Sequence, residues 1–171
     1  PGHRNVMIGS NSANLIADAY LNGVRGFDVE TLYAAMVKNA TTSEGRPKDK
    51  RGRTLTAVGR EGVEFYNRLG YVPYDVGINE NAARTLEYAT ADFALSRLAA
   101  ALGKMDDAKK YAAQAQNYRK LFDAESGWMR GRNQDGSWST PFNPYKWGDA
   151  FTEGNSVHYS WSVMQDVQGL I

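Results

Sequence analysis

Apolar side chains in the N-terminal part of the chain recur with the spacing of one α-helical face. The first stretch, residues 11–22, ends before Gly23, and its predicted face carries Leu15, Ile16, Ala19 and Tyr20. A second stretch begins after Asp28, a good N-cap residue, and ends near Ala40. Its predicted inner side chains are Leu32, Ala35 and Met36. The pattern predicts a hairpin of two helices.

Residues 41–62 lose this period and become charged. The charged residues are Arg46, Lys48, Lys50, Arg51, Arg53 and Arg60, together with Glu44, Asp49 and Glu61. A phosphate-binding patch is one interpretation, but no aromatic side chain is interleaved and no glycine-rich fingerprint is present. We therefore favour a solvated loop. Residues 62–70 predict a short helix ended by Gly70, and an extended segment follows up to Tyr74.

Residues 81–102 form the strongest helical pattern of the chain, with Gly103 as its stop signal. The predicted buried side chains are Leu86, Ala89, Phe93, Leu98 and Leu102. We expect Asp106 to cap a following helix that runs to Phe122. Its predicted inward side chains are Tyr111, Ala112, Ala115, Tyr118 and Phe122. The link between these two helices is short, so they should lie antiparallel.

A long segment without helical spacing, residues 123–152, is rich in aromatic side chains, proline and glycine. Helical spacing returns over residues 154–165, through Val157, Trp161 and Val163. A loop of this length within a compact domain usually has a function. We therefore predict a mainly α fold, part of a toroid of helical hairpins, with its site on the face of the long aromatic-rich loop.

Composition excludes several classes of site. The 171 residues are 42% hydrophobic and include no cysteine and two histidines, so disulfide scaffolds, thiol nucleophiles and histidine-rich metal cages are excluded. The net charge of +1 gives no general attraction to nucleic acid, and no apolar run is long enough to span a membrane. The chain opens at Pro1 and stops at the apolar residues 169–171. We expect a single domain, residues 1–171, that is a fragment of a larger catalytic domain.

Glu153 is the leading candidate for chemistry, because it lies where the aromatic loop meets a predicted helix start, near Asp149, Asn155 and His158. Free backbone N–H groups at the helix start favour the charged carboxylate, whereas surrounding aromatic side chains disfavour it. That conflict can tune a glutamic acid toward proton donation near neutral pH. A helix-capping glutamate without chemistry is the alternative.

The aromatic loop also has the composition of a sugar-binding surface, because aromatic faces stack on sugar rings while polar side chains bind hydroxyl groups. The side chains concerned are Trp128, Arg130, Arg132, Asn133, Trp138 and Trp147. Packing of the loop onto the helices is the alternative for any single tryptophan. Glycoside hydrolysis needs a second carboxylate, and spacing does not select among Asp135, Asp149 and Asp166 or a group outside the chain.

Several segments together resemble the bacterial exo-acting α-mannosidases of glycoside hydrolase family 92. They are residues 16–28 (IADAYLNGVRGFD), 69–73 (LGYVP), 85–89 (TLEYA), 115–118 (AQNY), 121–123 (LFD), 127–132 (GWMRGR), 135–138 (DGSW) and 151–155 (FTEGN). Their order and approximate spacing match the family over nearly the whole chain. The chain departs from the family pattern at two places. After the last motif, His158 replaces a glutamine, which leaves the preferred linkage open, and near the start Asn11 replaces a histidine.

The resemblance implies an (α/α)6 toroid, an upstream β-sandwich domain, and calcium-dependent, inverting hydrolysis of α-mannosides, with α-1,2 linkages favoured. It assigns the catalytic acid to Glu153. We take Trp128, Arg130, Trp147, Asn155 and His158 as substrate-binding residues. The general base and the calcium ligands should lie beyond Ile171, so we expect no metal ligand within the chain and no measurable hydrolysis by the chain alone.

The expected partners are a mannose-containing oligosaccharide such as an N-glycan and the rest of the same polypeptide, in a secreted or periplasmic protein. Two alternatives remain open from the sequence. One is another helical-toroid glycosidase or a polysaccharide lyase, and the other is a helical scaffold that binds sugar or protein without turnover. The hairpins show no self-similarity of the kind that a repeat array requires.

Overall fold

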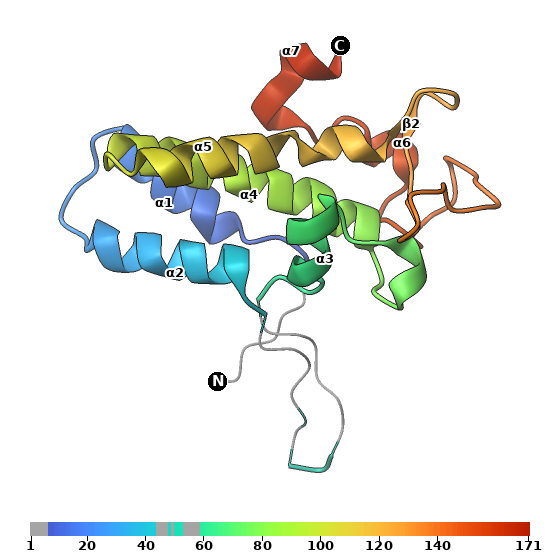
Figure 1. The fold of residues 1–171 in the computed structure, drawn as a ribbon, viewed down its shortest axis with the longest axis horizontal. Coiled ribbons are helices and arrows are strands. Elements are labelled where there is room, and N and C mark those ends of the chain that lie inside the picture. Colours follow the sequence, from blue (N-terminus) through green and yellow to red (C-terminus); the bar gives the residue numbers. More distant parts are fainter. Residues whose placement is uncertain (1–6, 44–47, 49, 53–58) are drawn as a thin grey trace.

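The computed structural model describes residues 7–43, 48, 50–52 and 59–171, and it is mainly helical (Figure 1). The α-helices are α1 (Asn11–Leu21), α2 (Val29–Thr41), α3 (Val63–Leu69), α4 (Asn81–Ala101), α5 (Met105–Gln114), α6 (Ser156–Tyr159) and α7 (Val167–Leu170). Short 3-10 helices are η1 (Tyr74–Val76), η2 (Ala115–Leu121) and η3 (Met164–Asp166), and an antiparallel pair joins β1 (Phe122–Asp123) to β2 (Trp128–Met129). Within the charged segment, Glu44, Arg46, Asp49 and Arg53 lie outside the described residues.

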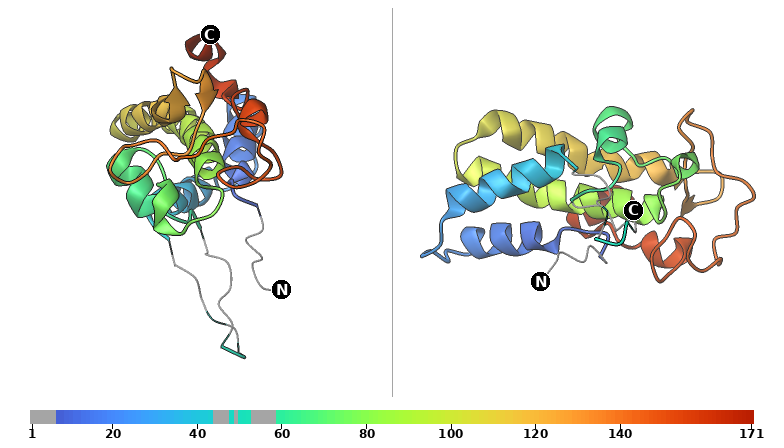
Figure 2. Two further views of the ribbon diagram at one scale, coloured as in Figure 1. Left: turned by 90° about the vertical axis from the view of Figure 1, so that its right-hand side faces the viewer. Right: turned by 90° about the horizontal axis from the view of Figure 1, so that it is seen from below.

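Helix α4 is the centre of the fold and is buried on most of its sides (Figures 1 and 2). It contacts α1 and α2 on one flank and α5 and η2 on the other. Its many alanine residues allow neighbouring helices to approach closely, while Phe93, Arg97 and Ala100 lie on its exposed side. The expected short link between α4 and α5 is confirmed, because Gly103 takes a left-handed conformation there, with φ 75°.

The predicted helix boundaries are largely confirmed at the N-terminal ends. Asp28 caps α2 by accepting a hydrogen bond from the Thr31 backbone N–H at 3.0 Å. The prediction for Asp106 is wrong, since α5 begins at Met105 after Lys104, and Asp106 lies in its first turn. The continuous helix predicted to Phe122 is also wrong, because the chain tightens into η2 after Gln114.

Several side chains predicted to be buried are exposed. Leu15 is 71% exposed and Phe93 is 38% exposed, while Ile16 and Tyr20 pack against the core as expected. Ala35, Ala112 and Phe122 are exposed as well. The small residues Ala13 and Ala17 are the buried side chains of α1 and belong to the core. Close packing of α1 on α4 favours the face that carries these alanine residues. A hydrophobicity pattern instead favours the face that carries Leu15, because leucine is more apolar than alanine.

The aromatic-rich loop packs against the first half of α4 and η2. Met129, Ala150, Phe151 and Val163 share one buried cluster with side chains of these helices. The helix predicted over residues 154–165 is wrong as a continuous element, because the structure breaks it into α6 and η3. Val163 enters the core while Trp161 faces solvent, an arrangement reached by leaving the helix after Tyr159.

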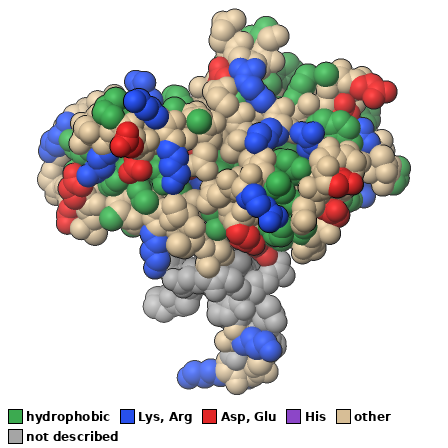
Figure 3. Space-filling model, viewed as in Figure 1, with side chains coloured by type: hydrophobic (Ala, Val, Ile, Leu, Met, Phe, Trp, Pro, Cys, Tyr) green, Lys and Arg blue, Asp and Glu red, His purple; other side chains and the backbone are tan. Residues whose placement is uncertain are grey.

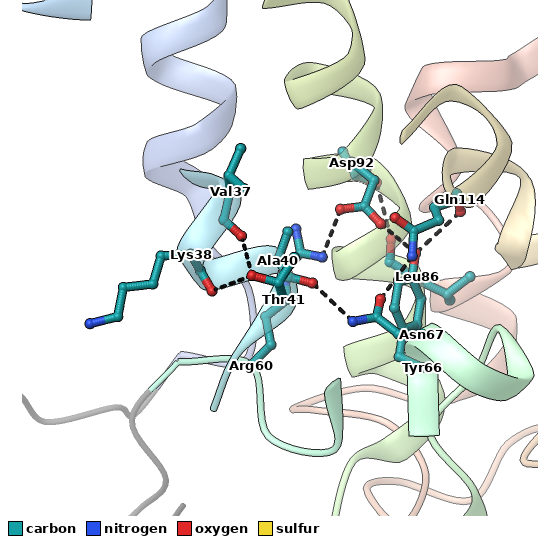
Figure 4. A network of polar contacts seen from close by, with 11 residues as sticks. Val37, Lys38, Ala40, Thr41, Arg60, Tyr66, Asn67, Leu86, Asp92 and Gln114 are labelled. Carbon is teal, nitrogen blue, oxygen red and sulfur yellow. Dashed lines mark hydrogen bonds and ion pairs between the residues drawn. The ribbon is translucent and has the colours of Figure 1, made fainter. Parts of the chain in front are cut away.

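A polar network with a buried centre joins α2, α3, α4 and α5 (Figure 4). Arg60 forms a 2.6 Å ion pair with Asp92, and their side chains are 3% and 0% exposed. Tyr66 donates its hydroxyl proton to the second oxygen of Asp92 at 2.9 Å. Burial raises the pKa of Asp92, and Arg60 and Tyr66 oppose this effect by stabilising the charged form. The ion pair holds the segment before α3 against the central helix.

Acidic and basic side chains are interspersed on the face seen in Figure 3, which agrees with the small net charge. This mixture gives no field of a single sign over that face. Within the described part of the chain, no helix is both long enough and apolar enough to cross a bilayer.

Candidate active site

Glu153 is the next-to-last residue of a turn over residues 148–154. The Gly148 N–H donates to the Gly154 carbonyl at 2.7 Å, and the Phe151 N–H donates to the Gly148 carbonyl at 3.2 Å. Asp149 and Glu153 both have positive φ, at 64° and 46°. A left-handed conformation costs a non-glycine residue about 1–3 kcal/mol, so the surrounding contacts must hold the turn in shape.

The N-terminal end of α4 supplies these contacts. The Glu80 N–H donates to the Asp149 carbonyl at 3.2 Å, and the Ala83 N–H donates to the Ala150 carbonyl at 3.0 Å. The Ala150 and Phe151 side chains are buried in the core. The turn that carries Glu153 therefore packs on the N-terminal end of α4, the longest helix among the described residues. The left panel of Figure 2 shows the molecule from this end.

Glu153 itself precedes the helix start and is exposed. Asn155 is the N-cap of α6, because its Oδ1 accepts a hydrogen bond from the His158 N–H at 3.2 Å. Glu153 therefore lies where the loop meets a helix start, as expected, but two residues before the N-cap, and the expected burial by aromatic side chains is wrong within the described residues. A four-residue helix also supplies little dipole. Within the described residues, Glu153 instead lies exposed at the surface of the loop.

Three of the predicted substrate-binding residues lie beside this turn. The rings of Trp147 and His158 meet edge to face with their centroids 6.0 Å apart, and Trp147 is 66% exposed. Asn155 donates its side-chain amide to the Tyr145 carbonyl at 3.4 Å. An exposed indole, an imidazole and an amide thus flank the segment that carries Glu153. This combination can stack on a sugar face and bind its hydroxyl groups.

Trp128 and Arg130 occupy different positions. Trp128 is half-buried in β2, and the backbone of its neighbour Met129 is tied to α6 by the hydroxyl groups of Ser156 and Ser160. Arg130 pairs with Asp123 at 2.9 Å and donates two hydrogen bonds to the Ser139 carbonyl. These contacts show that Arg130 stabilises the conformation of the loop. Its role in substrate binding stays a prediction.

Replacing Arg130 with alanine should lower the free energy of unfolding by about 2 kcal/mol, because it removes a charged hydrogen-bond donor from a nearly buried carboxylate. Burial tends to raise the pKa of Asp123, but hydrogen bonds from Arg130, Ser126 and the Glu125 backbone outweigh it and lower the pKa below 3.8. The pair therefore stabilises the fold above that pH and loses its effect as the pH falls further.

Denaturation at two pH values would measure this contribution. The guanidinium carbon of Arg130 lies over the Phe142 ring, and the Arg130→Met variant keeps a long apolar side chain without the charge, so it separates lost charge from lost packing. Unchanged stability of Arg130→Ala near neutral pH would contradict the stabilising role.

Each of the three candidate second carboxylates has hydrogen-bond or ion-pair partners. Asp149 lies in the same turn as Glu153 and pairs with Tyr74 and Lys146. Asp135 accepts hydrogen bonds from the Ser137 hydroxyl and N–H, which lower its pKa. Asp166 accepts hydrogen bonds from Tyr118, Gly169 and Arg119. Asp149 is thus the one of the three that the structure brings to the turn of Glu153.

Sequence reasoning missed Tyr74, whose hydroxyl binds Asp149 at 2.9 Å. The two residues lie 75 positions apart, and no local pattern links them. Among the residues that the structure describes, no group of three or more carboxylate or histidine side chains gathers as a site that could hold a metal ion. These residues therefore do not fit a calcium site by themselves.

A model of a known family covers the chain from end to end: residues 1–171 match the glycosyl hydrolase family 92 catalytic domain. The chain belongs to glycosyl hydrolase family 92. Family 92 membership confirms the resemblance, and the role of Glu153 stays a prediction. A comparison with curated proteins found no match.

Solved structures of family 92 proteins are similar to the chain in both fold and sequence. One is an inverting mannosidase from Bacteroides thetaiotaomicron VPI-5482, with 41% identity and a TM-score of 0.87 over 99% of this chain and 22% of that one. Another is an α-mannosidase from Bacteroides thetaiotaomicron, with 38% identity and a TM-score of 0.83 over 97% of this chain and 20% of that one.

The complex of the second protein with mannoimidazole matches with 35% identity and a TM-score of 0.84, over 98% of this chain and 21% of that one. The family 92 chain described here thus spans about a fifth of the length of these solved relatives.

Proposed function

We propose that the chain is part of the catalytic domain of an inverting α-mannosidase that removes α-1,2-linked mannose from the non-reducing end of mannosides or N-glycans. The match of residues 1–171 to the family 92 catalytic domain carries this proposal. The 41% identity to an inverting mannosidase supports the stereochemistry. In this proposal the helices α1 to α5 form part of an (α/α)6 toroid that other parts of the polypeptide complete.

Glu153 acts as the general acid. Its carboxyl proton passes to the glycosidic oxygen as the bond from that oxygen to the anomeric carbon breaks, and water attacks the opposite face of the sugar. Asp135 is held by a hydrogen bond from Ser137 and Asp166 by one from Tyr118, and Asp149 pairs with Tyr74 and Lys146. The base that activates water therefore comes from outside residues 1–171 in this proposal. Packing of that region over the exposed Glu153 would also supply the burial that favours a protonated acid.

The sugar packs against a surface that is formed by Trp147, His158 and Asn155. Their exposure and their place beside the turn support this role, since an aromatic face buries sugar C–H groups while the amide binds hydroxyl groups. Trp128 extends this surface, because it lies in β2 and β2 contacts α6. Arg130 contributes by keeping the loop in shape.

The resemblance also implies a calcium ion. Calcium supplies hard-ion coordination of sugar hydroxyl groups when it is bound, and it prefers oxygen ligands. Because no suitable cluster gathers among the described residues, the ligands come from elsewhere in the polypeptide in this proposal. A secreted or periplasmic location fits the resemblance, and detection of the protein in the extracellular or periplasmic fraction would support it.

The full polypeptide that carries this chain should release mannose from an α-1,2-mannobioside, with the β-anomer as the first product in an NMR time course. EDTA should abolish release and added calcium should restore it, while residues 1–171 alone should release none. α-Mannose as the first product would contradict inversion, and release in EDTA would contradict the calcium requirement. Unsaturated sugar products would indicate a lyase, and binding without turnover would indicate a scaffold.

A further inference from the structure

Asp149, which begins the turn of Glu153, is held on both of its carboxylate oxygens. The Tyr74 hydroxyl donates to Oδ1 at 2.9 Å, and the Lys146 ammonium group lies 3.1 Å from Oδ2. The hydrogen bond to Asp149 and partial burial raise the pKa of Tyr74, so its hydroxyl keeps the proton that it donates. The side chain that fixes the start of the turn therefore cannot rotate without breaking a contact.

Tyr74 is itself fixed to the body of the protein. Its N–H donates to the Arg132 carbonyl at 2.8 Å, and it follows Pro73, which is buried. Its ring lies so close to Gly131 that a Cβ added there would meet the ring at 2.9 Å. Tyr74 thus joins the segment after α3, the strand-like segment around residue 131 and the turn of Glu153.

The contact between Tyr74 and Asp149 restrains a strained turn. Asp149 and Glu153 are both in left-handed conformations, at the two ends of a turn whose backbone is closed between Gly148 and Gly154. Such conformations persist where the surroundings over-determine them. The α4 N–H groups fix the backbone of the turn, and Tyr74 fixes the Asp149 side chain. Releasing that side chain removes one restraint on the direction in which Glu153 points.

We propose that Tyr74 and Asp149 are positioning residues, which aim the Glu153 carboxyl group at the glycosidic oxygen. The inference rests on the proposed function, because it assumes that Glu153 is the acid. Displacement of a catalytic group by about 1 Å can cost on the order of 100-fold in rate. The rate should therefore fall for substrates whose leaving group needs a proton and should stay unchanged for substrates whose leaving group does not.

The test is Tyr74→Phe in the full polypeptide, which removes the hydroxyl group and keeps the ring against Gly131. The value of kcat for an α-1,2-mannobioside should fall by roughly tenfold, since the acid is misaligned but present. The value of kcat for a dinitrophenyl α-mannoside, whose leaving group needs no proton, should change less than about twofold, and KM should hold for both. Asp149→Asn, which keeps an acceptor for Tyr74, should retain more activity on the mannobioside than Asp149→Ala.

The matched control is Tyr33→Phe, which deletes another tyrosine–aspartate hydrogen bond, the 2.5 Å contact with Asp107, in a buried cluster that includes no residue of this turn. It should show no dependence on the leaving group. Equal losses of Tyr74→Phe on both substrates, or no loss, would overturn the inference. If Glu153→Gln depends on the leaving group and Tyr74→Phe does not, the inference alone fails. If Glu153→Gln shows no such dependence, the proposed acid fails instead.

Discussion

Substitution of Glu153 by glutamine is expected to reduce hydrolysis of an α-1,2-mannobioside by roughly 10²–10⁴-fold in the full polypeptide, the usual contribution of general acid catalysis. Glutamine keeps the size and hydrogen-bonding capacity of the side chain but cannot give up a proton to the glycosidic oxygen. An activated aryl mannoside should lose far less, because its leaving group departs without protonation. Steady-state kinetics on both substrates measure this difference.

The matched control for this prediction is Glu125→Gln, an exposed glutamate in the same loop region. It should leave both activities unchanged. Glutamine keeps the size of the side chain, so the variant should unfold at the same urea concentration as the parent polypeptide, and a lower kcat then reflects chemistry rather than unfolding. Equal loss on both substrates by the Glu153 variant would contradict its role as the acid.

Substitution of Asp92 by alanine is expected to destabilise the fold by about 3–5 kcal/mol. Arg60 would remain buried without its counter-ion, and among the described residues no hydrogen-bond partner faces its Nε atom. Tyr66 would lose the acceptor of one hydrogen bond as well. Urea denaturation of the polypeptide, followed by tryptophan fluorescence, measures the change.

A double variant separates the charge from general packing. Arg60→Met combined with Asp92→Leu removes both charges and fills a similar volume, and such replacements of buried ion pairs are often neutral or stabilising. We expect it to recover most of the stability that Asp92→Ala loses. A double variant as unstable as Asp92→Ala would show that the orphaned charge is not the cause.

The pattern of the sequence predicted the helices whose signals are local. Asp28 and Gly103 mark helix ends because an N-cap side chain and a left-handed glycine act on neighbouring backbone groups. The mainly helical class and the family follow in the same way from periodicity and short motifs. The position of Glu153 after the aromatic loop was also visible in the sequence, because it depends on the order of residues.

Tertiary packing decided which faces those helices bury. Leu15 is exposed and Ala13 is buried because α1 lies close against α4, and closeness favours a small side chain over a more apolar one. Packing also broke the helix predicted after Gly154, since Val163 has to reach the core. Neither outcome can be derived from hydrophobic spacing along one segment.

The surroundings of Glu153 were likewise decided in three dimensions. Sequence reasoning expected aromatic burial of Glu153, whereas the structure holds its turn on α4 and leaves Glu153 exposed within the described residues. The Tyr74–Asp149 contact joins residues 75 positions apart, so no local propensity encodes it. The sequence by itself determined the helical class, the family and the identity of the candidate acid, because these depend on residue type and order. The tertiary structure alone decided how that acid is held, because its supports come from distant segments that meet when the chain folds.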